Sequence, residues 1–316
     1  MKYTIGIDLG GTNIVVGLVD EQYHILDKAA VKTEADKGFE YITDNMKKLV
    51  ATLLERAGLT AADISSIGIG SPGTADKSTG AIIFSNNLHW HNAPLAATVQ
   101  AKTGIRTLVG NDADCAALGE FVAGAGAKDS SMALITIGTG VGSGLVMDGK
   151  LFCPAGSSAP ELGHTTLICG GEPCSCGRKG CVESYISFTA LIRDGNRAAD
   201  AHPDSMLAAL RAQGQKLNGK NIFDCAKAGD PAARALVDQF IEYMGQFFAN
   251  VGNGFGVRAI VVGGGISKEG SWLCERLHEI VVREMYVGEK FAPVIRMATL
   301  GNDAGVIGAA ALENYL

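Results

Sequence analysis

The hydrophobic and polar positions of the chain fall into segments typical of strands and amphipathic helices. Residues 3–8 and 14–20 are short apolar runs joined by a glycine-rich turn, which indicates two neighbouring strands. Residues 38–57 place Phe39, Ile42, Met46, Val50 and Leu53 at helical spacing, and a glycine follows where a helix commonly ends. Residues 64–69 form the next apolar run. We therefore expect an α/β protein.

The rest of the chain continues this alternation of short apolar runs and longer amphipathic segments. Residues 184–250 are mostly helical in pattern. We predict further strands at 105–109, 131–137, 145–147, 258–262 and 294–297, and helices at 94–103, 113–124, 273–285 and 301–316.

The chain also resembles itself. Residues 11–19, GTNIVVGLV, align with residues 138–146, GTGVGSGLV, and each copy reads as a Gly-Thr turn followed by a returning strand. Two copies predict two domains of like architecture facing one cleft. We expect a small α/β domain of residues 1–112 with 301–316, and a large one of residues 113–300. The alternative is a chance likeness between two glycine-rich hairpins.

A Gly-Thr turn between strands aims backbone N–H groups and a hydroxyl into one concavity, which suits a polyphosphate. Asp8, at the end of the first strand, could hold Mg²⁺ directly or through water. Purely conformational use of glycine is the competing interpretation. The predicted nests consist of Gly10, Gly11, Thr12 and Asn13 in the first turn, and Gly138, Thr139 and Gly140 in the second.

Two further glycine motifs differ in what they predict. Gly263, Gly264 and Gly265 follow a strand and leave room for an adenine or ribose, although a turn with positive φ explains them equally well. The spacing G-x-G-x-x-G at residues 68–73 matches a dinucleotide fingerprint. We reject that match because SPGTADKSTG after the strand does not read as a helix.

Asn111 and Asp112 follow a predicted strand at the edge of the expected cleft. A carboxylate there could accept a proton from a substrate hydroxyl. The alternative is structural, because Asp112 also stands where an aspartate would cap the next helix.

Composition and charge exclude several classes of partner. The 316 residues are 47% hydrophobic with a net charge of -6, and no block of like charge favours nucleic acid or an anionic membrane. The start of the chain lacks a secretory apolar region, and no run is long enough to span a bilayer. We therefore expect a cytoplasmic protein with reduced thiols.

The segment ELGHTTLICGGEPCSCGRKGCVE, residues 161–183, carries four of the eight cysteines. Cys174, Cys176 and Cys181, with His164 upstream, form a ligand set typical of structural zinc. Cys169 ends an apolar run, and we interpret it as a core residue at a strand end. The alternatives are a disulfide, which a cytoplasmic setting disfavours, and free buried thiols.

At this point the motifs resemble the ROK family of sugar kinases and repressors. Its pattern matches DLGGTN at 8–13, ND at 111–112, ELGH at 161–164, CSCGRKGCVE at 174–183 and GGGIS at 263–267, in that order. The similarity spans essentially the whole chain. CVESYISFTAL from residue 181 and GNDAGVIGA from residue 301 look most like bacterial ROK glucokinases.

The resemblance implies the two-domain actin-like (ribonuclease-H-type) sugar kinase fold and phosphorylation of the glucose 6-hydroxyl by ATP with Mg²⁺, a step of glycolysis. Alternatives are a kinase for N-acetylmannosamine, N-acetylglucosamine, fructose or allose, and a sugar-sensing regulatory protein. By resemblance Asp112 is the general base, and zinc binds His164, Cys174, Cys176 and Cys181. The implied sugar contacts are Asn87, Asn111, Asp112, Glu161, His164 and Glu183, and the implied ATP contacts are the two hairpins with Gly264 and Gly265.

Some features depart from the family or extend it. Pro160 stands where a glycine is usual, and Gly256-Val257 replaces the usual Asn-Pro before the adenosine strand. Family repressors carry an added DNA-binding segment that we do not expect here. The resemblance also implies a homo-oligomer, either a dimer or a dimer of dimers. Because the predicted zinc lies between Glu161 and Glu183, we expect its loss to weaken sugar binding more than ATP binding.

Overall fold

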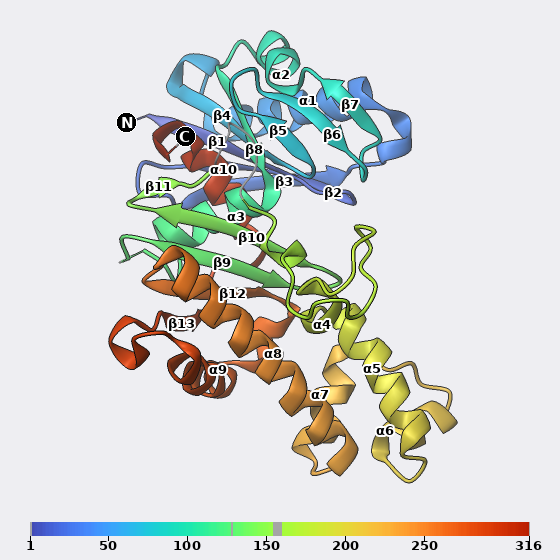
Figure 1. Cartoon of the computed structure of the whole chain (residues 1–316). Coiled ribbons are helices and arrows are strands. Elements are labelled where there is room, and N and C mark those ends of the chain that lie inside the picture. Colours follow the sequence, from blue (N-terminus) through green and yellow to red (C-terminus); the bar gives the residue numbers. More distant parts are fainter. Residues whose placement is uncertain (1, 128, 154–159, 316) are drawn as a thin grey trace. The chain divides into compact units, whose positions relative to one another are not determined.

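The computed structural model describes residues 2–127, 129–153 and 160–315. The chain forms two five-stranded sheets with the same order of strand roles, β3-β2-β1-β4-β8 and β11-β10-β9-β12-β13 (Figure 1). The first sheet consists of β1 (Tyr3–Leu9), β2 (Asn13–Val19), β3 (Ile25–Lys32), β4 (Ile64–Ser71) and β8 (Thr107–Asn111). The second consists of β9 (Met132–Ile137), β10 (Val141–Met147), β11 (Lys150–Leu151), β12 (Ala259–Gly264) and β13 (Val294–Met297).

These two orders confirm that the sequence repeat is structural. In each sheet a glycine hairpin joins the first two strands of the repeat, β1 with β2 and β9 with β10. β1 pairs with β2 antiparallel and with β4 parallel, and β12 pairs with β13 parallel. A chance likeness between two hairpins would not carry over to the order of the surrounding strands.

The helices follow the predicted pattern closely. α1 (Phe39–Ala57) ends at Gly58, whose left-handed conformation (φ 66°) confirms the predicted glycine stop. The other helices of the first half are α2 (Leu95–Thr103) and α3 (Asp112–Ala123). The second half contains α4 (Glu183–Ile186), α5 (Phe188–Ala201), α6 (Met206–Ala212), α7 (Gly219–Lys227), α8 (Pro231–Phe255), α9 (Ser271–Glu284) and α10 (Ala304–Tyr315).

The first sheet buries its two faces in different ways. Ile5, Ile7 and Leu9 of β1 are fully buried in a core that includes residues of α1 and α2. Between them Gly6 allows α10 to approach closely, because a Cβ there would lie 1.9 Å from the carbonyl oxygen of Val306. Side chains alternate across a strand, so β1 presents Ile5, Ile7 and Leu9 to one face, whereas Gly6 lies on the other face between Thr4 and Asp8. Figure 1 shows α1 and α2 on one face and α10 on the other.

The structure corrects two predictions. Residues 74–93 contain a three-stranded sheet of β5 (Thr74–Asp76), β6 (Ala81–Ser85) and β7 (Trp90–Ala93), which the predicted strands did not include. Trp90 is buried there against Phe39, with ring centroids 5.0 Å apart. The predicted last helix extends to residue 316, which lies outside the described residues, and α10 begins at Ala304 after a short 3₁₀ turn.

The chain divides into two compact units. One comprises residues 1–134, 143–160 and 298–316, and the other comprises residues 135–142 and 161–297. The boundary passes within β9 and β10. The predicted domain limits at residues 112 and 300 stay a prediction. Among the described residues, no helix is both long and apolar enough to cross a membrane.

Candidate functional site

The first hairpin is held by Thr33, the residue directly after β3. The Gly10 N–H donates to the Asn13 carbonyl at 2.9 Å and closes the turn. The Thr33 N–H donates to the Thr12 carbonyl at 2.9 Å, and the Thr33 hydroxyl donates to the Gly10 carbonyl at 2.6 Å. Gly11, Thr12 and Asn13 are exposed. Because turn carbonyls are already occupied, the exposed edge can present its N–H groups to an anion, as predicted for a nest.

Two carboxylates stand near this hairpin. Burial and the neighbouring Asp112 raise the pKa of Asp8 from 3.8 to about 6. Burial also raises the pKa of Asp112, against the lowering effect of a hydrogen bond from the Ala113 N–H. A cation between or beside two such groups would favour their charged forms. The pair therefore fits either a Mg²⁺ ligand or a proton acceptor, which are the predicted roles.

The structural alternative for Asp112 is wrong. Asn111 is the N-cap of α3, and its side-chain oxygen accepts from the N–H groups of Ala113 and Asp114 at 2.8 and 3.3 Å. The Asn111 amide also donates to the Gly73 carbonyl at 3.0 Å. Asp112 is instead the first residue of the helix. The carboxylate of Asp112 is therefore not required to cap the helix.

The predicted residue Asn87 lies close to the first hairpin. It is exposed between β6 and β7, and its Cβ is 3.8 Å from where a Cβ on Gly11 would be.

The second hairpin, Gly138 to Gly140, is held by residues far along the chain. Gly138 donates to the Gly140 carbonyl at 3.0 Å, and the Gly138 carbonyl accepts from the Phe188 N–H at 2.8 Å. The Thr139 carbonyl accepts from the Thr189 hydroxyl at 2.7 Å. As in the first hairpin, the turn carbonyls are occupied and Thr139 is exposed.

One of the three consecutive glycines, residues 263–265, is required by its backbone conformation and close packing. Gly264 adopts φ 79°, and a Cβ there would lie 2.3 Å from the carbonyl oxygen of Ile137. Both facts require glycine, so the positive-φ interpretation is confirmed for this position. Gly265 begins a 3₁₀ turn and packs against the Phe188 ring. Binding of adenosine at these glycines stays a prediction.

The four predicted metal ligands meet at one point. The donor atoms of His164, Cys174, Cys176 and Cys181 all lie within 4.8 Å of one another. Cys174 Sγ is 3.6 Å from His164 Nδ1, and Cys176 Sγ is 3.7 Å from Cys181 Sγ. Zinc–sulfur bonds of about 2.3 Å in a tetrahedron place two sulfurs about 3.8 Å apart, so this set fits a tetrahedral ion.

The surroundings of these thiols also suit a metal. Burial alone would raise the pKa of Cys174, but hydrogen bonds from the Cys176 backbone and the neighbouring thiols lower it to about 6. Burial and the adjacent thiols raise the pKa of Cys181 to about 12. Thiolate is the metal-binding form of cysteine, and metal binding releases the remaining protons.

Cys169 does not belong to this cluster, and our interpretation of it was wrong. It is exposed and lies in a turn, not at a buried strand end. The apolar run before it misled the sequence argument because Leu167 and Ile168 are only partly buried in an irregular loop.

The two carboxylates that bracket the metal segment have different surroundings. Glu161 is exposed before a 3₁₀ turn that contains His164. Glu183 begins α4, and its Oε2 accepts from the Val141 N–H at 3.0 Å, while its Oε1 accepts from the Ser175 hydroxyl at 3.0 Å. Sequence reasoning missed Ser175, Thr33 and Thr189, because single hydroxyl residues in loops carry no distinctive pattern.

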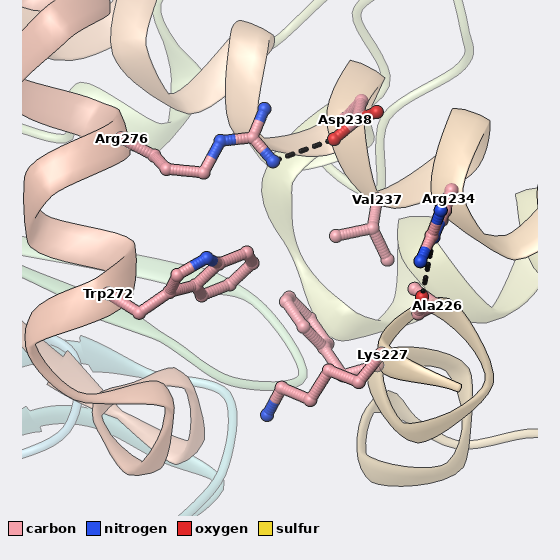
Figure 2. Close-up of a pocket in the computed structure, with 8 residues that line it drawn as sticks. Ala226, Lys227, Arg234, Val237, Asp238, Trp272 and Arg276 are labelled. Carbon is pink, nitrogen blue, oxygen red and sulfur yellow. Dashed lines mark hydrogen bonds and ion pairs between the residues drawn. The ribbon is translucent and has the colours of Figure 1, made fainter. Parts of the chain in front are cut away.

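A pocket of about 560 Å³ between α7, α8 and α9 was also missed. Figure 2 shows Trp272 and Arg276 on one side, with the Arg276 guanidinium paired to Asp238 at 2.7 Å. Lys227 on the rim is paired at 2.6 Å with Glu269, which ends the 3₁₀ turn after the triple glycine. The pocket lining is Phe223, Ala226, Lys227, Arg234, Val237, Asp238, Trp272 and Arg276.

Two like sheets, each with a glycine hairpin, define an α/β protein of actin-like architecture. The ROK family model matches residues 4–315, and the chain therefore belongs to the ROK family. It is 36% identical over 310 residues to a glucokinase of Halalkalibacterium halodurans, covering 97% of this chain and 93% of that protein. It is 34% identical to a glucokinase of Thermotoga maritima, covering 98% and 96%.

A solved structure also resembles this chain over nearly its full length. The ROK family glucokinase from Streptomyces griseus, crystallised in complex with glucose and AMPPNP, superposes with a TM-score of 0.77 at 35% identity. The likeness covers 98% of both chains. The actin-like fold predicted from the motifs is confirmed.

Proposed function

We propose that the protein is an ATP-dependent glucokinase that transfers the γ-phosphoryl group of ATP to the 6-hydroxyl of glucose. The observation that carries this proposal is the near full-length likeness to a glucokinase that was solved with glucose and an ATP analogue. Both glycine hairpins, and the two carboxylates near the first, agree with it. Phosphoryl transfer depends mainly on positioning and charge stabilisation, which such parts supply.

In this mechanism Asp112 accepts the proton of the sugar hydroxyl while that oxygen attacks the γ-phosphorus and ADP leaves. The N–H groups that do not close the turns, those of Gly11 and Thr12 in the first hairpin and of Thr139 and Gly140 in the second, would bind the phosphates. Asp8 would hold Mg²⁺, which supplies charge neutralisation at the phosphates when bound. The proposed sugar contacts are Asn87, Asn111, Asp112, Glu161, His164 and Glu183.

Zinc is the metal proposed for His164, Cys174, Cys176 and Cys181. Three sulfurs and one imidazole nitrogen fill a closed tetrahedral set, so the role is structural. A homo-oligomer is proposed from the family resemblance alone. Light scattering of the purified protein measures its mass in solution. The mass of a monomer would contradict the proposed homo-oligomer.

We further assign the purine base of ATP to the pocket between α7, α8 and α9. Trp272, 40% exposed, offers an aromatic face, and the buried Phe223 lies at the same pocket. The Lys227–Glu269 ion pair joins this pocket to the turn after the triple glycine. Trp272→Ala should raise the KM for ATP about fivefold with little change in kcat, since one aromatic contact contributes about 1 kcal/mol. An unchanged KM would place the base elsewhere.

The activity is tested by a coupled assay of ADP formation with Mg-ATP and a panel of sugars. The panel is glucose, N-acetylmannosamine, N-acetylglucosamine, fructose and allose. The proposal expects the highest kcat/KM with glucose. A higher kcat/KM with an N-acetylated sugar would replace glucose as the substrate. Sugar binding without any ADP formation would instead indicate a regulatory protein.

A further inference from the structure

Three hydrogen bonds join the second hairpin to one short stretch, residues 183–189. Glu183 accepts from the Val141 N–H at 3.0 Å, just after the turn. The Phe188 N–H and the Thr189 hydroxyl donate to the carbonyls of Gly138 and Thr139 at 2.8 and 2.7 Å. A Cβ on Gly140 would lie 2.5 Å from Glu183 Oε2, so this carboxylate lies directly against the turn. The position of the hairpin therefore depends on where residues 183–189 lie.

That stretch begins two residues after a metal ligand. Cys181 is fully buried, and Glu183 is the first residue of α4. The second oxygen of Glu183 accepts from the hydroxyl of Ser175, which stands between two other ligands, Cys174 and Cys176. Cys174 Sγ itself lies 3.9 Å from Glu183 Oε1. One carboxylate thus contacts the metal loop through one oxygen and the phosphate hairpin through the other.

The metal loop has little regular structure of its own. Residues 165–182 contain turns and isolated bridges, such as Thr166 with Cys181 and Pro173 with Lys179, but no helix or longer strand. Gly170, Gly177 and Gly180 adopt positive φ, so the loop's sequence permits many other conformations. A bound metal would therefore supply much of the constraint that fixes Ser175 and Cys181.

We propose that metal bound at His164, Cys174, Cys176 and Cys181 sets the nucleotide affinity of the second hairpin, with Ser175 and Glu183 as positioning residues. The inference rests on the proposed function, because it takes the hairpin as a phosphate site. Our expectation from the sequence was that metal loss weakens sugar binding more than ATP binding, and the proposal adds a direct effect on nucleotide affinity. The direct contact between Glu183 and Val141 is what the sequence could not show.

The test is equilibrium binding of Mg-ADP without sugar, measured by isothermal titration calorimetry. Three proteins are compared, namely the zinc-loaded wild type, Cys176→Ala and Cys169→Ala. Cys169 is an exposed cysteine of the same loop outside the ligand set, so its variant is the matched control. We expect Cys176→Ala to lose zinc by elemental analysis and to weaken Mg-ADP binding about tenfold, as for loss of one or two hydrogen bonds. Cys169→Ala should match the wild type in both.

Ser175→Ala separates the link from the metal. It keeps all four ligands, so zinc content should stay near that of the wild type, yet Mg-ADP should bind about threefold more weakly. Ser175→Thr restores a hydroxyl and should recover affinity. In chelator-treated protein, Ser175→Ala should cause no further loss, because the loop is no longer fixed.

Each outcome bears on the proposal. Equal Mg-ADP affinity of zinc-loaded and chelator-treated wild type would overturn it, and this comparison does not depend on whether Cys176→Ala folds. Zinc-replete Ser175→Ala with wild-type affinity would remove Ser175 from the link. Absence of Mg-ADP binding in every form would contradict the proposed function and this inference together. Metal-dependent Mg-ADP binding in a protein that phosphorylates none of the sugars would support the inference and contradict only the kinase activity.

Discussion

The two glycine hairpins share a Gly-Thr sequence but differ in the hydrogen bond that closes the turn and in their supports. In each, a threonine hydroxyl and a backbone N–H from elsewhere occupy the turn carbonyls. The first hairpin receives both from Thr33, which is fully buried directly after β3 of the same sheet. The second receives them from Phe188 and Thr189, at the start of a helix that follows the metal loop.

The two copies of the repeated hairpin therefore depend on different parts of the protein for their positions. The first hairpin is fixed by Thr33, directly after β3, which is the edge strand that pairs with β2. Only a change that disturbs this sheet should therefore move the hairpin. The second is fixed by a segment that extends from an irregular loop closed by metal ligands. The first also has two carboxylates with raised pKa close by, whereas the second contacts one carboxylate that joins it to the loop.

The largest expected effect concerns the carboxylates near the first hairpin. Asp112→Asn removes the proposed proton acceptor but not the helix cap, which belongs to Asn111. We expect kcat to fall at least about a hundredfold, the low end for general base catalysis, with no loss of thermal stability. Steady-state kinetics and circular dichroism measure both. The exposed Asp36→Asn serves as control, and near-normal kcat in Asp112→Asn would exclude Asp112 from the mechanism.

Glycine substitutions should distinguish a closely packed position from an open one around the second hairpin. Gly264→Ala forces a side chain to φ 79° and to 2.3 Å from the Ile137 carbonyl oxygen. We expect a loss of about 2–4 kcal/mol in the free energy of unfolding, measured in urea. At Gly138 no described atom lies within 4 Å of an added Cβ. Gly138→Ala should therefore unfold within about 0.5 kcal/mol of the wild type, and a large loss there would contradict the open turn.

A smaller effect should appear in the pH dependence of stability. The folded-state pKa of Asp8 is about 6 against 3.8 for an ordinary aspartate, so the folded state binds the proton more tightly. Stability from this group is therefore present at low pH and declines as pH rises from about 4 to about 6. Asp8→Asn should be more stable than the wild type at pH 7 by up to about 3 kcal/mol without Mg²⁺. Equal unfolding curves of the two proteins at pH 4 and pH 7 would contradict the raised pKa.

Much of this could be predicted from the sequence, because motifs and periodicity report local structure. The helices, most strands, both hairpins and the metal ligand set were found in this way, the last because three cysteines and one histidine form a specific pattern. The three-stranded sheet at 74–93 was missed because its strands are short and contain polar residues. Cys169 was misplaced because an apolar run predicts burial only when a sheet or helix lies over it.

The contacts that distinguish the hairpins could not be predicted. Thr33, Ser175 and Thr189 act through hydrogen bonds to residues 23, 8 and 50 positions away in the sequence. Nothing in their own sequence neighbourhood signals these partners. Asp112 was weighed as a cap for a related reason, since two adjacent polar residues before a helix do not show which of them caps it.

The most direct test measures Mg-ADP affinity of Thr33→Val and Thr189→Val, each with zinc and after chelation. Each substitution removes one hydroxyl that holds one hairpin, and each should weaken binding about two- to tenfold in the zinc-loaded protein. After chelation, Thr33→Val should still cause its full loss, whereas Thr189→Val should cause little more. If both substitutions cost the same affinity with and without zinc, the two hairpins have equivalent supports and the account is wrong.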